Sequence, residues 1–143
     1  MRAADIGTSR VIQLNESSSV NEAARIMRQH DVGCVVMTKN TLASALPSGI
    51  VTDRDLAIRF LAKDAGDEKT LRDIQSMPLV TCHADATIDE LVAIMLGSHV
   101  RRVPILDEEG QLIGIVCLDD VMAALAELMQ RVSRALTGER ALE

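Results

Sequence analysis

The stretch Gly49–Leu56, "GIVTDRDL", has a near-copy at Gly114–Val121, "GIVCLDDV". Both copies begin with Gly-Ile-Val and end with an acid and an apolar residue, but Thr52 of the first copy is replaced by Cys117 in the second. A phrase that recurs in one short chain indicates an internal repeat, and a repeat determines how the whole chain is divided.

The similarity extends well beyond this phrase. A shift of 68 residues places Ser19–Met27, "SVNEAARIM", on Thr87–Met95, "TIDELVAIM". After a loop the shift becomes 65 and aligns Gly49 with Gly114, so the first copy carries three extra residues in that loop. We therefore predict repeat 1, a polar linker, repeat 2 and a C-terminal tail at residues 1–62, 63–70, 71–136 and 137–143.

Each repeat has the same predicted order of elements. A short β-rich run is followed by a helix that starts at a capping box and buries apolar residues at i, i+3, i+4 and i+7. Two strands come next, and a second helix begins just after the repeated phrase. The markers of the two copies are the runs Val11–Leu14 and Leu79–Cys82, the boxes Ser19-x-x-Glu22 and Thr87-x-x-Glu90, and the helix starts Asp53 and Leu118.

These elements predict an α+β fold made of two β-α-β-β-α repeats. Neither repeat has enough helix to cover both faces of its sheet, so we expect the two to pack on each other with pseudo-two-fold symmetry. The chain of 143 residues is long enough for one domain of this kind.

Composition excludes several classes of protein. The net charge of -6 argues against a general nucleic-acid binder. No run approaches the ~18 apolar residues of a membrane span, and no secretory signal is recognisable at the start of the chain. Three cysteines without a CxxC motif favour a reduced, cytoplasmic setting. Phe60 is the one aromatic residue, so a bound base would be held by aliphatic walls.

The final helix has an apolar seam formed by Val121, Leu125, Leu128 and Val132, which continues past the point where the first copy stops. Two interpretations remain open. The seam either caps the core of its own subunit or forms part of a homodimer interface.

The repeated phrase, the order of the elements and the signatures "HDVGCVVM", "HVRRVPILD" and "GIVCLDDVMAAL" resemble a tandem pair of CBS (cystathionine-β-synthase) domains, also called a Bateman module, of the stand-alone bacterial type. The resemblance covers nearly the whole chain. It implies a regulatory protein that senses adenine nucleotides or related adenosyl ligands in clefts between its two repeats. AMP, ADP and ATP are the expected ligands, with S-adenosylmethionine and NAD as alternatives.

The phrase itself has the chemistry of a ribose site. Ile50 and Val51 offer an apolar edge for a base, and Thr52 places a hydroxyl beside the unpaired amides at the start of a helix. Asp55 lies one turn further, where its carboxylate can accept hydrogen bonds from both ribose hydroxyls. Thr-x-x-Asp is also an ordinary capping box, and the two roles are compatible.

The resemblance implies that basic residues on the middle strand of the other repeat bind phosphate. Arg101 and Arg102 occupy that place, and arginine suits phosphate because its planar fork donates two hydrogen bonds at once. Adjacent strand residues point to opposite faces, so two interpretations remain open: both arginines bind phosphate, or one of them forms a surface salt bridge. Arg54 lies beside the ribose site and faces either phosphate or solvent.

The second cleft should be degenerate. Cys117 has only a weak donor and acceptor in place of the hydroxyl, although Asp120 is kept. Gly33 and Cys34 stand where the opposite repeat has its arginines, so this cleft should also lack cations. We therefore expect one working cleft and one degenerate cleft for each chain.

The sequence also argues against other functions. No nucleophile–base pair, Walker motif or GxGxxG is present, which argues against an enzyme, and no catalytic cofactor is expected. The three histidines and three cysteines lack zinc-ligand spacing, so no metal site is expected either. The alternatives to the nucleotide sensor are a ligand-free interaction module and a metal- or redox-responsive protein. In each case the partner would be regulated in trans or through self-association, without nucleic acid or membrane.

Overall fold

The computed structural model describes residues 1–40, 45–63, 69–75 and 78–138. Within them the chain forms two three-stranded sheets of identical topology, each with its middle strand parallel to the first and antiparallel to the third. The strands of the two sheets are β1 (Gln13–Asn15), β2 (Cys34–Asn40) and β3 (Ala45–Thr52), then β4 (Cys82–His83), β5 (Arg102–Leu106) and β6 (Leu112–Cys117). The predicted α+β fold with two β-α-β-β-α repeats is confirmed.

The first helix of each unit starts at the predicted N-cap residue, and the reciprocal capping box forms at Thr87. The helices are α2 (Val20–His30) and α5 (Ile88–Ser98). The Ser19 hydroxyl accepts a hydrogen bond from the Glu22 amide at 3.0 Å, and the Thr87 hydroxyl accepts one from the Glu90 amide at 3.3 Å. Each bond satisfies an amide that has no partner inside the helix. Both helices end on a left-handed residue, Asp31 or His99, which turns the chain into the next strand.

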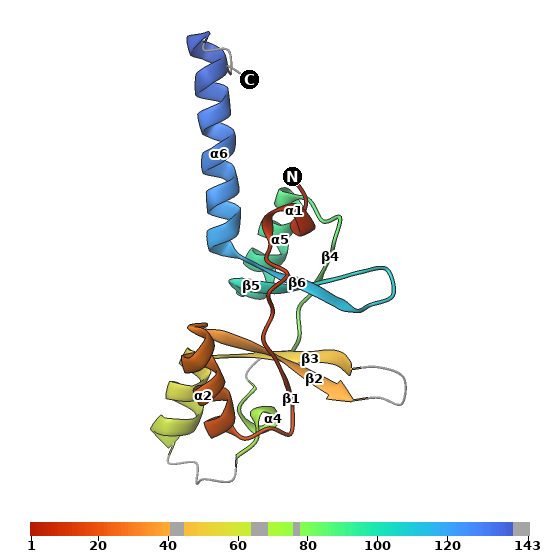
Figure 1. The fold of residues 1–143 in the computed structure, drawn as a ribbon, viewed down its shortest axis with the longest axis vertical. Coiled ribbons are helices and arrows are strands. Elements are labelled where there is room, and N and C mark those ends of the chain that lie inside the picture. The colour runs from red at the N-terminus through yellow and green to blue at the C-terminus, as the bar shows by residue number, and fades with distance from the viewer. Residues whose placement is uncertain (41–44, 64–68, 76–77, 139–143) are drawn as a thin grey trace.

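The second helices of the two units differ. In the first unit a short segment runs through α3 (Asp53–Asp55), the π-helical η1 (Leu56–Phe60) and the 3₁₀ turn η2 (Leu61–Lys63). In the second unit α6 (Leu118–Thr137) is a single α-helix of 20 residues that projects away from the rest of the molecule (Figure 1).

The short helix at the start of each repeat packs on the other unit. α1 (Ala3–Ile6) docks on the second unit, where the Ala3 amide donates to the Ala86 carbonyl at 2.8 Å. In the same way α4 (Leu71–Ile74) docks on the first unit, where the Leu71 amide donates to the Ser18 carbonyl at 2.9 Å. The units as they pack therefore differ from the continuous segments 1–62 and 71–136 of the sequence.

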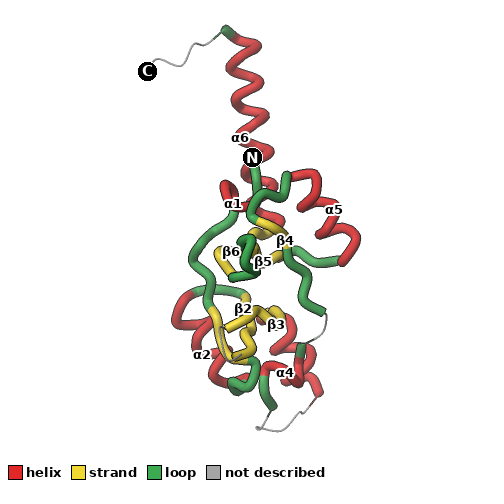
Figure 2. Tube along the Cα trace, turned by 90° about the vertical axis from the view of Figure 1, so that its right-hand side faces the viewer, coloured by secondary structure: helices red, strands yellow, loops and turns green. Residues whose placement is uncertain are grey.

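Each unit has its own core, and the sheets lie between the helices with their inner faces toward each other (Figures 1 and 2). Because strand residues alternate between faces, Val35 and Met37 enter the first core whereas Val36 points to the opposite face. Val103 and Ile105 enter the second core, and Pro104 points away from it. Val36 and Pro104 are nevertheless fully buried, as expected for residues enclosed between two sheets.

Gly49 of the repeated phrase is crowded by the ends of two neighbouring side chains. A Cβ at this position would collide with the Gln75 amide group and with the end of the Met37 side chain. Gly114 is similarly crowded, since its Cβ would lie 2.9 Å from the Thr8 carbonyl oxygen. The repeated glycines thus let another segment of the chain cross the sheet.

Candidate functional site

A cavity of about 440 Å³ lies between the two units. Its walls come from the end of β3 and the start of α3 in the first unit, and from the segment before β4 and the α5–β5 turn in the second. The lining residues from the first unit are Ile50, Thr52, Asp53, Arg54 and Asp55, and those from the second are Pro78, Leu79, Val80, His99, Val100, Arg101 and Arg102. This volume falls within the usual range of small-molecule sites.

Thr52 and Asp55 form one wall of the cavity and are held by a capping box. The Thr52 amide donates to Asp55 Oδ2 at 2.9 Å, and the Thr52 hydroxyl donates to the same oxygen at 3.0 Å. The hydroxyl also accepts from the Asp55 amide at 3.2 Å. Arg59 lies one turn further, with its Nε 3.6 Å from Asp55 Oδ1. The cap interpretation is therefore confirmed, and it fixes both side chains at the edge of the cavity.

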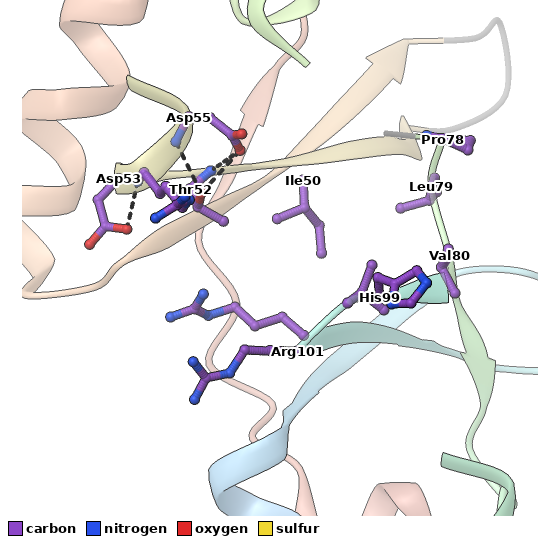
Figure 3. Close-up of a pocket in the computed structure, with 12 residues that line it drawn as sticks. Ile50, Thr52, Asp53, Asp55, Pro78, Leu79, Val80, His99 and Arg101 are labelled. Carbon is purple, nitrogen blue, oxygen red and sulfur yellow. Dashed lines mark hydrogen bonds between the residues drawn. The ribbon is translucent and has the colours of Figure 1, made fainter. Parts of the chain in front are cut away.

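Arg101 and Arg102 form the facing wall (Figure 3). Arg101 precedes β5, so strand alternation does not force the two side chains apart, and both line the cavity. Within the described part of the chain neither arginine has an ion-pair partner. Two guanidinium groups without a carboxylate partner make this wall electropositive.

Gly33 allows the guanidinium of Arg102 to approach the first unit. A Cβ built on Gly33 would lie 3.4 Å from Arg102 Nη2 and 3.3 Å from Asp53 Oδ2. Substitution by a larger residue would therefore displace one of these two side chains. The Asp53 carboxylate is held locally by the Arg54 amide at 2.8 Å.

The opposite end of the cavity is apolar. Ile50 points into the space from the first unit, and Pro78, Leu79 and Val80 line the far end together with His99 (Figure 3). The sequence did not predict Pro78, Leu79, Val80 or His99 as residues of the site. The three apolar residues belong to an extended segment before β4, and no local periodicity marks an extended segment as a wall. Only the proximity of His99 to Arg101 in the sequence could have indicated its position.

Two predicted residues have different surroundings. Val51 is fully buried in the core of the first unit and does not line the cavity, because it points to the opposite face of β3 from Ile50. Arg54 lines the cavity but is exposed to solvent.

A smaller cavity of about 130 Å³ is lined by Cys117, Leu118 and Asp119 together with Arg101 and Arg102, all from the second unit. The Asp120 carboxylate does not line it but accepts a hydrogen bond from the Cys117 amide at 2.7 Å. Arg101 and Arg102 therefore border both this cavity and the larger one.

The cysteines have little thiolate character. Burial raises the pKa of Cys34, with Arg102 opposing the shift, and burial also raises the pKa of Cys117. Burial raises the pKa of Cys82 to about 11 from its ordinary value of 9.0. Because the thiolate is the reactive form, none of the three thiols is activated as a nucleophile. No cluster of three potential metal ligands occurs among the residues described here.

This assignment predicts slow alkylation. At pH 8 all three thiols of the folded protein should react with iodoacetamide more slowly than a free cysteine. Cys82 should be slowest, since a pKa near 11 leaves roughly 100-fold less thiolate than a pKa of 9. Peptide mass spectrometry of timed samples measures each rate, with urea-unfolded protein as the control. A cysteine that reacts equally fast in both states would contradict the assignment.

In the part of the chain that the structure describes, no helix is both long enough and apolar enough to span a membrane.

Known proteins share this architecture. The family model "CBS domain" matches the chain twice, at residues 3–61 and 71–127. An uncharacterized protein of Methanopyrus kandleri, MK0525, is 37% identical over 113 residues, which span 78% of this chain and 56% of the relative. The chain therefore covers just over half the length of that relative.

Two further proteins are similar over most of their length. Hypoxic response protein 1 of Mycobacterium tuberculosis is 31% identical over 126 residues, or 87% of this chain and 85% of the relative. The crystal structure of the CBS domain pair of protein MJ0100, solved with 5′-methylthioadenosine and S-adenosyl-L-methionine, superposes with a TM-score of 0.76 at 24% identity, covering 89% of this chain and 97% of that one. The chain belongs to the CBS domain family and carries two copies of the domain as a pair, a module of the regulatory type.

Proposed function

We propose that the protein is a regulatory sensor that binds an adenine nucleotide, AMP, ADP or ATP, in the cavity between its two CBS units. The observation that carries the proposal is the meeting of Thr52 and Asp55 from one unit with Arg101 and Arg102 from the other around one cavity of about 440 Å³. The cavity has an apolar end, a hydroxyl- and carboxylate-bearing wall, and a cationic wall. These three environments match the base, the ribose and the phosphate of a nucleotide.

The carboxylate of Asp55 would accept hydrogen bonds from the ribose. Its capping contacts with Thr52 hold this carboxylate at the edge of the cavity. The cap also restricts the rotamer of Asp55, so the carboxylate loses little entropy when the ligand binds.

The two arginines favour a ligand with phosphate. The protein MJ0100 binds S-adenosylmethionine and methylthioadenosine, which share an adenosyl group with the nucleotides but carry no phosphate. Arg101 and Arg102 would repel the sulfonium cation of S-adenosylmethionine, whereas a phosphate forms charge-assisted hydrogen bonds with both. The chain should therefore prefer AMP, ADP or ATP to S-adenosylmethionine, with NAD as a further phosphate-bearing candidate.

Binding would transmit a signal by changing how the units pack. A ligand that touches both units stabilises the arrangement in which its two walls are correctly spaced, and so shifts the population toward that arrangement. The change would reach a protein partner in trans or a second copy of the chain. The residues of the cavity contain no nucleophile–base pair, and the proposed role is regulatory rather than catalytic.

Ligand binding should raise the melting temperature. At a nucleotide concentration 100-fold above Kd, binding stabilises the folded state by about 2.7 kcal/mol, which raises Tm by roughly 5–10 °C for a chain of this size. Differential scanning fluorimetry with AMP, ADP, ATP, NAD, S-adenosylmethionine and adenosine checks this. Isothermal titration calorimetry should then give one strong site for each chain. Absence of a shift with every adenosyl compound would refute the proposal, and two equal sites would refute the asymmetry between the clefts.

A further inference from the structure

Asp53 places a carboxylate at the end of the cavity that Arg101 and Arg102 border. One of its oxygens, Oδ1, accepts a hydrogen bond from the Arg54 amide at 2.8 Å. Within the described part of the chain, the other oxygen, Oδ2, accepts no hydrogen bond, and the side chain forms no ion pair. The helix dipole favours an acid in this first turn, but it does not explain why Asp53 lines the cavity.

The Asp53 carboxylate faces the arginines across the junction of the two units. A Cβ on Gly33 would lie 3.3 Å from Asp53 Oδ2 and 3.4 Å from Arg102 Nη2, so the two groups border the same space. Figure 3 shows Asp53 at the end of the cavity toward which the Arg101 side chain extends, whereas Pro78 lies at the other end. A phosphate bound by the arginines would therefore have Asp53 as its neighbour on the other wall.

The charges at this end match one phosphate group rather than a chain of them. Asp55 is already compensated by Arg59, whose Nε lies 3.6 Å from Asp55 Oδ1. The phosphate of AMP carries about −1.5 to −2 charges at pH 7, and each further phosphate adds about one more. The other charged lining residues are three arginines and one aspartate, which leave a net charge of +2: Arg54, Arg101, Arg102 and Asp53. The additional phosphates of ADP and ATP would therefore remain uncompensated beside the Asp53 carboxylate.

We propose that Asp53 is a ligand of a divalent cation, Mg²⁺, that enters the cavity together with the phosphate chain of ADP or ATP. The proposal rests on the proposed nucleotide site, because phosphate oxygens must supply further ligands. Mg²⁺ binds oxygen at about 2.0–2.1 Å and is commonly held by one or two carboxylates together with substrate phosphates and water. The protein alone offers too few ligands, since no cluster of three potential metal ligands occurs among the described residues.

The cation removes two unfavourable interactions. Its charge compensates the additional phosphates, and the Asp53 carboxylate becomes a ligand of the ion instead of a group that repels the phosphate chain. AMP needs no cation, because the arginines already balance its single phosphate. The cavity thus binds AMP alone but takes ADP and ATP as their Mg²⁺ complexes.

Isothermal titration calorimetry of the whole chain, in excess Mg²⁺ or in EDTA, tests this assignment. ADP and ATP should bind about tenfold or more tightly with Mg²⁺, because in EDTA the additional phosphates face Asp53 uncompensated. The affinity for AMP should differ by less than about twofold between the two conditions. If AMP binds but the affinity for ADP is the same in both conditions, the inference is overturned and the nucleotide site stands. If none of the three nucleotides binds, the nucleotide site and the inference both fall.

Asp53→Asn distinguishes a metal ligand from a residue that supports the cavity. In EDTA the variant should bind ADP more tightly than the wild type, because the repelling charge is gone. In Mg²⁺ it should bind ADP more weakly, because a ligand of the ion is lost. A variant that keeps the full Mg²⁺ dependence, or that loses affinity for AMP and ADP equally in both conditions, would overturn the inference.

The matched control is Asp89→Asn. Asp89 is an exposed acid in the first turn of α5 and does not line the cavity between the units. Its replacement removes the same charge and the same kind of contact with a helix dipole. Asp89→Asn should therefore bind all three nucleotides like the wild type, with and without Mg²⁺. A change of Mg²⁺ dependence equal to that of Asp53→Asn would show an effect of overall charge and overturn the assignment of Asp53.

Discussion

Replacing Asp55 by alanine should lower the affinity for AMP roughly 5- to 150-fold, equivalent to about 1–3 kcal/mol, because ribose hydroxyls would lose hydrogen bonds to a charged acceptor. Calorimetric titration of the purified variant measures the change. The structure shows that the substitution has a second effect, since Asp55 Oδ2 also accepts from the amide and the hydroxyl of Thr52. Loss of this cap should reduce the stability of the fold by about 1 kcal/mol.

The chain provides a matched control for this second effect. Asp120 occupies the equivalent position of the second unit and accepts a hydrogen bond from the Cys117 amide at 2.7 Å, but it lines neither of the two cavities that Arg101 and Arg102 border. Asp120→Ala should therefore reduce the stability of the fold by a similar or slightly smaller amount. The affinity for AMP should change little. Urea unfolding measures the stability of both variants. Equal losses of affinity at Asp55 and Asp120 would show that capping, and not ribose binding, explains the effect.

The sequence predicted those features that depend on local patterns. The N-cap at Ser19, the capping box at Thr87 and the helix starts at Asp53 and Leu118 are found where expected, because each is set by residues three or four positions apart. The family resemblance further predicted that Thr52 and Arg101 would meet across the units, and the structure places both on one cavity.

Features that depend on contacts distant in the sequence were not predicted. The exchange of α1 and α4 between the units rests on backbone hydrogen bonds such as that from Ala3 to Ala86, and helices of four residues have no periodicity that reveals their partners. The shift of 68 residues makes Cys34 and Arg102 equivalent positions of the two repeats. This equivalence alone would have predicted that the two positions lie close together between the units. Equivalent residues meet near a pseudo-two-fold axis, which accounts for Arg102 lying beside Gly33 and bordering both cavities.

Replacing Arg101 and Arg102 together by alanine should have the largest effect on nucleotide affinity. Charge-assisted hydrogen bonds contribute about 1.5–3 kcal/mol each, and the two contributions are not fully additive because both would contact one phosphate group. We expect AMP to bind at least 100-fold more weakly, while the affinity for adenosine, which has no phosphate, should change little. Calorimetry with both ligands measures the difference. A parallel loss for AMP and adenosine would mean that the arginines support the fold of the cavity and do not bind phosphate.

Two comparisons separate phosphate binding from a general effect of charge. Arg28→Ala removes the same charge from the exposed surface of α2 and should leave AMP affinity nearly unchanged at physiological salt. Replacing both cavity arginines by lysine keeps the charge but loses the planar fork, so only part of the affinity should return.

Arg102→Ala also has a readout without ligand. The Arg102 cation holds the pKa of Cys34 below the level that burial alone would set, so its removal should raise that pKa and slow alkylation of Cys34. If Arg102→Ala both slows the alkylation of Cys34 and weakens AMP binding, the Arg102 guanidinium contacts the phosphate and also lies at the junction of the two units. An unchanged rate of Cys34 alkylation would mean that Arg102 makes no contact across that junction.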